Sequence, residues 1–316
     1  MITSAQKMLM ARAGVPAGGG GGGGSTLFGP RGVFGGGSTG AATNTIDYIT
    51  IATAGNAIDF GDLTLARSNL AATSDGSRGV FGGGYGTANT NTIDYITIAT
   101  AGNAIDFGDL TLARSNLAAT SDGSRGVFGG GYGTANTNTI DYITIATAGN
   151  AIDFGDLTLA RYSVAATSDG SRGVFGGGYS GAYSNTIDYI TIATTGNATD
   201  FGDLTLGRQL LAATSDGSRG VFGGGHAPSI RNNIDYITIA TTGNATDFGD
   251  LSYARYGLTA TSDGSRGVFG GGKVYIYPNT YYLNTIDYIT IATTGNATDF
   301  GDLTVGRSDL AATSGG

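Results

Sequence analysis

The chain has 316 residues, 59 of them glycine, with no cysteine, no tryptophan and one histidine, and its formal net charge at pH 7 is −8. The missing cysteines exclude disulfides, thiolate metal sites and thiol nucleophiles, and a single histidine argues against Ser-His-Asp catalysis and multi-histidine metal sites. The acidic balance argues against a nucleic-acid partner, and the lack of any run approaching roughly 18 apolar residues argues against membrane insertion.

The remaining composition predicts an all-β protein. All 24 acidic residues are aspartate, and lysine occurs only at Lys7 and Lys273, so good helix formers are scarce. The residue types that favour strands, such as threonine, isoleucine, valine and tyrosine, are frequent. Hydrophobic residues make up 40% of the chain and charged residues 13%, which is the reverse of the balance typical of disorder.

Residues 1–30 precede the repeated part of the chain, and their sequence indicates a segment separate from the repeats. A short helix over residues 2–13 would be too short to be stable alone in water. The glycine run at 18–24 is typical of a flexible tether. We therefore expect a docking peptide on a tether, with a disordered tail as the alternative. The segment lacks the apolar core of about 7–15 residues that a secretion signal needs. The expected anchoring residues are Met8, Leu9 and Met10.

A repeat of 47 residues organises the rest of the chain. The heptapeptide RGVFGGG begins at Arg31, Arg78, Arg125, Arg172, Arg219 and Arg266. A second marker, IDYITIAT, follows each copy, and its last spacing is longer by a five-residue insertion between Lys273 and Asn284. Residues 45–91 and 92–138 are identical, which indicates recent duplication.

Each unit predicts four short strands, which in the second unit are residues 68–74, 78–84, 92–100 and 104–110. An Asp-Gly turn joins the first two strands. The third strand places Ile93 and Tyr95 on one face and Ile96 and Ile98 on the other, so both faces of the sheet must be covered. Four-stranded sheets covered on both faces by copies of themselves are typical of propeller blades.

The ends of the repeat predict how the blades close into a ring. Residues 31–316 begin with a second-type strand at Arg31 and end with a first-type strand at 308–314, so each end supplies what the other lacks. We expect a six-bladed β-propeller closed by pairing of these two strands. An open stack of β-repeats is the structural alternative, but it would leave both edges unpaired.

Repeated carboxylates could suggest catalysis, but their sixfold recurrence favours a structural role. Asp59 and Asp62 of the IDFGD segment recur in every unit, and we expect Arg67 or Arg78 to be their partners. We expect no catalytic residues, no cofactor and no metal site, although the aspartates leave calcium between blades open. The expected protein is not an enzyme.

Differences between the copies predict a binding face. The segment after each Gly-Gly-Gly and the position after the arginine that precedes each first strand both vary, while the two tight turns hardly change. In an up-and-down blade the variable segments project from one face, and loops on a rigid scaffold carry binding. Neutral drift of the loops is the alternative. The expected ligand-binding residues are Tyr179, Tyr183, His226, Arg231, Lys273, Tyr275, Tyr277, Tyr281 and Tyr282.

The repeated segments of the chain resemble those of the kelch-repeat propellers. The segment VFGG at 80–83 looks like the family's double-glycine strand, Asp94-Tyr95 resembles its acidic-aromatic pair, and Arg114 resembles the arginine ahead of the next blade. Phe107 stands where the family's usual tryptophan is expected. The near-identical units also look like kelch-like repeats of marine bacteriophages. The family serves many roles, so the resemblance implies the fold more than the function.

Together these features lead to three functional hypotheses. The first is a non-enzymatic display module of a phage particle, on tail or capsid, made in the host cytoplasm and located in the virion. It would bind other virion proteins through residues 1–30 and a host surface glycan or protein through the variable loops. The second is an intracellular kelch-type interaction scaffold, and the third is a propeller hydrolase or lyase.

Overall fold

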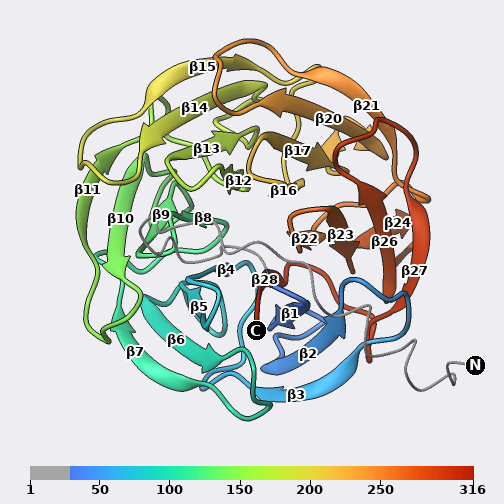
Figure 1. The fold of residues 1–316 in the computed structure, drawn as a ribbon, viewed down its shortest axis with the longest axis horizontal. Coiled ribbons are helices and arrows are strands. Elements are labelled where there is room, and N and C mark those ends of the chain that lie inside the picture. The colour runs from blue at the N-terminus through green and yellow to red at the C-terminus, as the bar shows by residue number, and fades with distance from the viewer. Residues whose placement is uncertain (1–28) are drawn as a thin grey trace, which may run out of the picture.

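The computed structural model describes residues 29–316, which form a closed ring of six four-stranded antiparallel sheets (Figure 1). Residues 29–316 contain no helix. The predicted all-β, six-bladed propeller is therefore confirmed, and the open stack is excluded. The prediction for residues 1–30, including Met8, Leu9 and Met10, falls almost entirely outside the described residues.

The blades follow one another around the ring, and we number them from the one that holds both ends of the described chain. Blades 1 to 3 consist of β28 (Ala311–Gly315), β1 (Arg31–Gly35), β2 (Thr45–Thr50) and β3 (Ile58–Asp62); β4 (Ala71–Ser74), β5 (Arg78–Gly82), β6 (Thr92–Thr97) and β7 (Ile105–Asp109); and β8 (Ala118–Ser121), β9 (Arg125–Gly129), β10 (Thr139–Thr144) and β11 (Ile152–Asp156).

Blades 4 to 6 repeat this order from the axis outward. Their strands are β12 (Ala165–Ser168), β13 (Arg172–Gly176), β14 (Thr186–Thr191) and β15 (Thr199–Asp203); β16 (Ala212–Ser215), β17 (Arg219–Gly223), β20 (Asn233–Thr238) and β21 (Thr246–Asp250); and β22 (Thr259–Ser262), β23 (Arg266–Gly270), β26 (Thr285–Thr290) and β27 (Thr298–Asp302). Two small hairpins rise from the loops of blades 5 and 6, β18 (His226–Ala227) with β19 (Ser229–Ile230), and β24 (Lys273–Ile276) with β25 (Asn279–Tyr282).

The C-terminal strand closes the ring by pairing with the N-terminal strand. β28 runs antiparallel to β1, with Arg31 opposite Gly315 and Gly35 opposite Ala311. Blade 1 is thus built from both ends of the described chain, as the repeat predicted. Both strands of the first hairpin are shorter than predicted at the open end of the hairpin, away from its turn. In blade 2 the first strand starts at Ala71 and the second ends at Gly82, because Asn69, Gly83 and the following glycine have positive φ and turn the chain out of the sheet.

Both faces of every blade are buried against its neighbours, as predicted. Ile93 and Tyr95 pack in the core between blades 2 and 3, whereas Ile96 and Ile98 pack in the core between blades 1 and 2. On the outer strand β7, Phe107 is the extra residue of a β-bulge. Its side chain packs in the same core as Ile93, although its neighbours on β7 face outward. Six such cores, one between each pair of blades, hold the ring together.

An aromatic ring from each blade lies on a glycine of the preceding blade. The Phe81 side chain is fully buried, and a Cβ at Gly35 would lie 2.6 Å from its Cε1 atom. The contact recurs in each blade and crosses the ring closure, where Phe34 lies on Gly270. The first glycine of each Gly-Gly-Gly is therefore required by the close approach of blades.

A buried ion pair fixes each connection between blades. Arg67, in the segment between blades 1 and 2, contacts Asp94 of β6 at 3.1 Å and donates to the carbonyl of Phe81, and both charged side chains are fully buried. Burial lowers the pKa of Arg67, and the nearby Asp94 opposes that shift. The hydroxyl of Thr64 donates to the other oxygen of Asp94 at 2.6 Å. The same pairing joins Arg307 to Asp47.

The predicted partners of Asp59 and Asp62 were wrong. Arg67 pairs with Asp94 of the next blade. Arg78 stacks on Tyr95, and it donates to the carbonyls of Ile145 and Ala146, which follow β10 in blade 3. Asp59 and Asp62 lie exposed on the outer strand β3. Sequence spacing alone could not show this, because the ion pair joins residues of consecutive units.

Removing one charge of a buried ion pair should lower the free energy of unfolding much more than removing both charges. Replacing Arg67 with methionine leaves the carboxylate of Asp94 buried without its counter-charge, and we expect a loss of about 3–5 kcal/mol in the free energy of unfolding. Adding Asp94→Asn should recover a large part of the loss, because no net charge remains buried and the new amide oxygen still accepts from Thr64. Urea unfolding measures both values, and a double variant as unstable as Arg67→Met would contradict this interpretation.

A polar collar and an aromatic arc on the loop face

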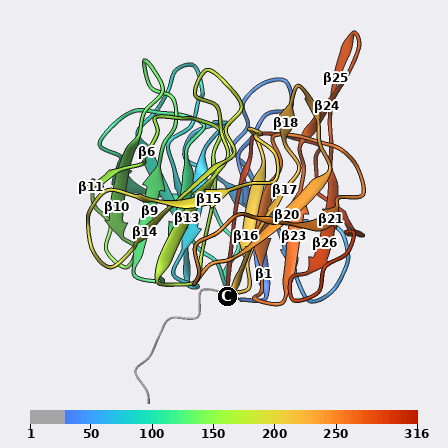
Figure 2. The ribbon, with the colours of Figure 1, turned by 90° about the horizontal axis from the view of Figure 1, so that it is seen from above.

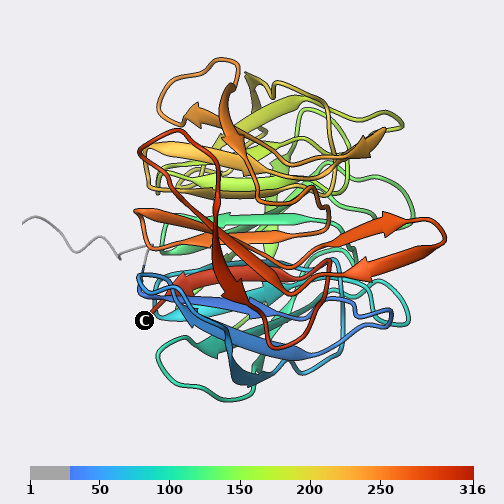
Figure 3. The same ribbon diagram turned by 90° about the vertical axis from the view of Figure 1, so that its right-hand side faces the viewer.

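The variable segments all lie on one face of the ring, as predicted. The loops between second and third strands meet the connections between blades there, for example where Ser68 pairs with Tyr85 and Tyr162 pairs with Tyr179. We call this surface the loop face and the opposite surface the turn face. The hairpin β24–β25 projects from the loop face, whereas the C-terminus and the start of β1 lie on the turn face (Figures 2 and 3).

Six residues form a closed hydrogen-bonded ring around the axis, which we call the collar. Each residue donates its backbone N–H to the carbonyl of the preceding member, at 2.6–3.1 Å, and each has a φ of 56–65°. The bonds return to their starting point without a break, so the collar joins all six blades. The members in order are Asn69, Asn116, Ser163, Leu210, Gly257 and Asp309.

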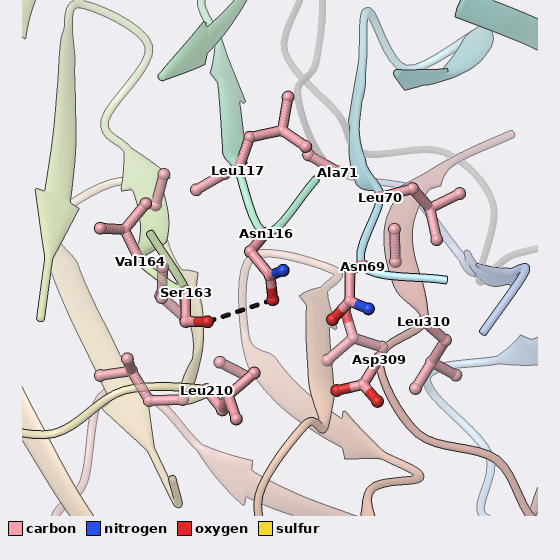
Figure 4. Close-up of a pocket in the computed structure, with 18 of the residues that line it drawn as sticks. Asn69, Leu70, Ala71, Asn116, Leu117, Ser163, Val164, Leu210, Asp309 and Leu310 are labelled. Atoms are coloured by element: carbon pink, nitrogen blue, oxygen red, sulfur yellow. Dashed lines mark hydrogen bonds between the residues drawn. The ribbon is translucent and has the colours of Figure 1, made fainter. Parts of the chain in front are cut away.

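The collar surrounds the mouth of a small cavity on the axis (Figure 4). The cavity measures about 120 Å³, and the leucine, valine and alanine residues that follow each collar member form its apolar wall. The side chains of the collar are not alike: two members are asparagine, and the other four are serine, leucine, glycine and aspartate. The backbone is nearly sixfold symmetric, but the chemistry around the mouth is not.

Asp309 is the charged member of the collar and is tied down on one side only. Its Oδ2 atom accepts from Lys273 Nζ at 2.6 Å and from Ser308 Oγ at 2.8 Å. Its Oδ1 atom is buried and has no hydrogen-bond partner among residues 29–316. The Oδ1 atom lies over Gly257, where a Cβ would be only 2.5 Å away.

Aromatic side chains form a continuous row on the loop face, which we call the aromatic arc. Neighbouring ring centroids are 5.5–5.7 Å apart, mostly in tilted or edge-to-face geometry. The row crosses from blade 3 to blade 6 and ends where Lys273 Nζ lies 5.3 Å from the last ring. Its members are Tyr132, Tyr162, Tyr179, Tyr183, His226 and Tyr256.

Most other positions of the same circle are small and polar, and Tyr85 stands apart as a tyrosine outside the row. The positions equivalent to Tyr162 and Tyr256 are serines at 68, 115 and 308, and Ser38 stands where Tyr132 and Tyr179 stand in other blades. The arc therefore covers one side of the loop face and leaves the other side open. The two sides of the loop face therefore differ in their chemistry.

Packing within the arc changes the acidity of its members. Burial and then the charge of Arg231 lower the pKa of His226 below the ordinary histidine value of 6.5. The Nδ1 atom of His226 lies 3.1 Å from the hydroxyl of Tyr183, which can donate to it when the imidazole is neutral. Burial raises the pKa of Tyr162, and the neighbouring tyrosines raise it further, so its hydroxyl stays protonated at neutral pH.

The structure divides the predicted binding residues into two groups. Tyr179, Tyr183 and His226 belong to the arc, Arg231 lies beside His226 and donates to the carbonyl of Ala227, and Lys273 connects the arc to the collar. The second group consists of the hairpin tyrosines, of which Tyr275, Tyr277 and Tyr281 are exposed and Tyr282 is half-buried.

The hairpin explains why its tyrosines do not form a single surface with the arc. Tyr275 pairs with Thr280 and Tyr281 pairs with Val274, so Tyr275 and Tyr281 point to opposite faces of β24–β25. Tyr277 stands at the tip and is 85% exposed. The five inserted residues thus form part of an extended hairpin arm, whereas the sequence predicted only a longer loop.

Sequence reasoning missed three members of the arc, Tyr132, Tyr162 and Tyr256. Tyr162 and Tyr256 occupy the variable position after the arginine, so a signal was present. Tyr132 was hidden because its unit is identical to the preceding one, in which Tyr85 has no aromatic neighbour at position 115. Only the meeting of consecutive units, where Tyr162 approaches Tyr132, turns this tyrosine into part of a row.

The described part of the chain contains neither a cluster of metal ligands nor a membrane-spanning helix. In residues 29–316 no three histidine, cysteine, aspartate or glutamate side chains are grouped so that they could hold a metal ion. No helix in this part has the length and apolar character needed to cross a bilayer.

Comparisons with known proteins add no family to this geometry. No protein-family model matches the chain, and a search of curated proteins finds no match. The fold is that of a six-bladed β-propeller of 47-residue repeats, established by its own sheets and register.

The single histidine offers a direct test of the arc. Because its folded-state pKa is depressed, we expect the NMR signals of His226 to titrate below 6.5. As the pH falls, the histidine takes up its proton in the unfolded chain before it does so in the folded protein. The contribution of His226 to stability is therefore fully present above the pKa of the unfolded state, and it is lost as the pH falls through the pKa of the folded state. Substituting Tyr183 with phenylalanine should alter this titration, and a pKa above 6.5 in the native protein would refute the packing described.

Proposed function

We propose that the protein is a non-enzymatic module that binds a surface glycan through the aromatic arc. The observation that carries this proposal is the unbroken row of six rings on the loop face. Aromatic rings combine a large apolar face with polar groups at the edge, which suits sugars, whose rings have apolar faces and hydroxyl rims. Tyrosine also gives contact area at low conformational cost.

The point at which the described chain enters the ring supports a display role. The described chain enters β1 from the turn face, which is opposite the loop face that carries the arc (Figure 3). A module attached through residues 1–30 would present its loop face away from the attachment. With the kelch-like repeats and their likeness to those of marine bacteriophages, this arrangement supports a virion component that recognises a host surface.

The alternatives have less support from the geometry. A hydrolase or lyase would need carboxylates near the ligand, but the repeated aspartates Asp59 and Asp62 lie exposed on the outer strand, away from the arc. An intracellular interaction scaffold remains compatible with the fold, and a protein bound through the arm at Tyr277 would favour it. We propose that the protein binds without turnover.

Two identical repeats provide a matched test of the arc. Tyr132 and Tyr85 occupy the same position of units that are identical in sequence, but only Tyr132 contacts a further ring. On an array of bacterial surface oligosaccharides, Tyr132→Ser and Tyr179→Ser should each weaken binding about tenfold, corresponding to about 1.4 kcal/mol. Tyr85→Ser should bind as the unchanged protein does. Equal losses at Tyr85 and Tyr132, or no glycan binding at all, would reject the arc as the glycan site.

A further inference from the structure

One cationic side chain of the ring has neither a carboxylate nor an aromatic ring as its partner. Six arginines are buried beside an aspartate, as Arg67 is beside Asp94. Six others stack on a tyrosine of their own blade. Lys273 pairs with Asp309. Among residues 29–316 this leaves Arg231, whose one side-chain hydrogen bond goes to a backbone carbonyl.

The guanidinium of Arg231 keeps a nitrogen that a ligand can reach. Its Nη2 atom donates to the carbonyl of Ala227 at 3.1 Å, and its Nε atom is buried. The Nη1 atom has no hydrogen-bond partner in the described part of the chain, and it retains accessible surface on a side chain that is only half-buried. The N–H groups of Nη1 are therefore available to an acceptor from outside the protein.

The position of Arg231 carries a structural hydroxyl in other blades. Threonine stands there in blades 1 to 3, and in blade 2 the hydroxyl of Thr90 contacts that of Thr92 at 2.8 Å and accepts from its backbone N–H at 3.1 Å. Blade 5 has Arg231 and Asn233 at these two positions and lacks both hydroxyls. The cation thus belongs to one blade and replaces a contact that the repeat otherwise uses.

Arg231 lies beside the aromatic arc. It directly follows the small hairpin β18–β19, in which His226 pairs with Ile230. The ring of His226 stands between those of Tyr183 and Tyr256 in the arc. A sugar that lies on these rings therefore has the guanidinium at its edge.

We propose that the loop face selects acidic glycans, with Arg231 Nη1 donating to an anionic oxygen of the bound sugar. Such a charge-assisted hydrogen bond is roughly twice as strong as a neutral one. The carboxylate of a uronic acid and a sulfate ester both supply the oxygen. The chain carries a net charge of −8, so its overall field repels an anionic glycan and the selection depends on this local cation. This inference rests on the proposed glycan-binding function and adds the class of sugar.

The substitution Arg231→Thr tests the role of the cation without a foreign residue. Threonine occupies this position in blades 1 to 3, and no carboxylate loses its partner when Arg231 is removed. Asn233→Thr is the matched control, because it makes the other half of the change toward the blade 2 sequence and leaves the charge in place.

Matched pairs on an array of bacterial surface oligosaccharides measure the preference. Each uronic acid stands beside its carboxyl-reduced form, and each sulfated sugar beside its desulfated form. We expect acidic members of one type of pair to bind about tenfold more tightly than their neutral forms, and the type identifies the anionic group. Arg231→Thr, but not Asn233→Thr, should abolish the difference.

The possible failures of this experiment separate the two proposals. Equal binding of acidic and neutral members, or a preference that survives Arg231→Thr, would overturn the selection by Arg231 and leave the arc as the glycan site. Binding of no oligosaccharide would overturn the selection and count against the proposed function.

The imidazole of His226 provides a second measurement on the unchanged protein. Burial, and after it the charge of Arg231, lower the pKa of this histidine. An anion bound at Nη1 offsets that charge, so the pKa of His226 at saturation should be higher with an acidic sugar than with its neutral counterpart. NMR titration of the two complexes measures both values, and equal pKa values would overturn the contact with Arg231.

Discussion

Pairing of β28 with β1 is the constraint on which the structure depends. Each blade has two apolar faces, so every blade needs a neighbour on both sides. A row of such blades can meet that need for its end members only by bending into a ring. The two ends of the described chain meet within blade 1, where Arg31 stands opposite Gly315, and the ring closes without an exposed core.

Closure also accounts for which residues repeat and which vary. The glycine under Phe81, the arginine that pairs with Asp94 and the bulged Phe107 all act between or within blades, so a change in any copy would disturb its neighbours. Collar side chains and loop residues point to the axis or to solvent. Their backbone is fixed by hydrogen bonds, which leaves the side chains free to differ, as Leu210 and Asp309 do.

The repeat made the architecture readable from the sequence. A period of 47 residues, apolar side chains on both faces of the third strand and complementary chain ends were enough for the ring and its six blades. The strand ends were misplaced because a positive φ at residues such as Asn69 leaves no clear mark in a run of small residues. Ion-pair partners were missed because Arg67 and Asp94 lie in consecutive units, and neither unit alone shows the contact. The binding face was located by its variability, but the arc required knowledge of which loops touch, as with Tyr132 and Tyr162.

Native-state hydrogen exchange tests ring closure most directly. The strands β28 and β4 share the sequence AATS and occupy the same place in their blades. A tight turn joins β4 to the second strand of its blade, whereas no turn joins β28 to β1 and only non-covalent contacts hold the two strands together. If the ring is closed as described, amides of β28 should exchange about as slowly as those of β4, because both open only when the blade opens. Exchange of β28 faster by orders of magnitude, with β4 still protected, would show that the end of the chain frays and that the ring is open.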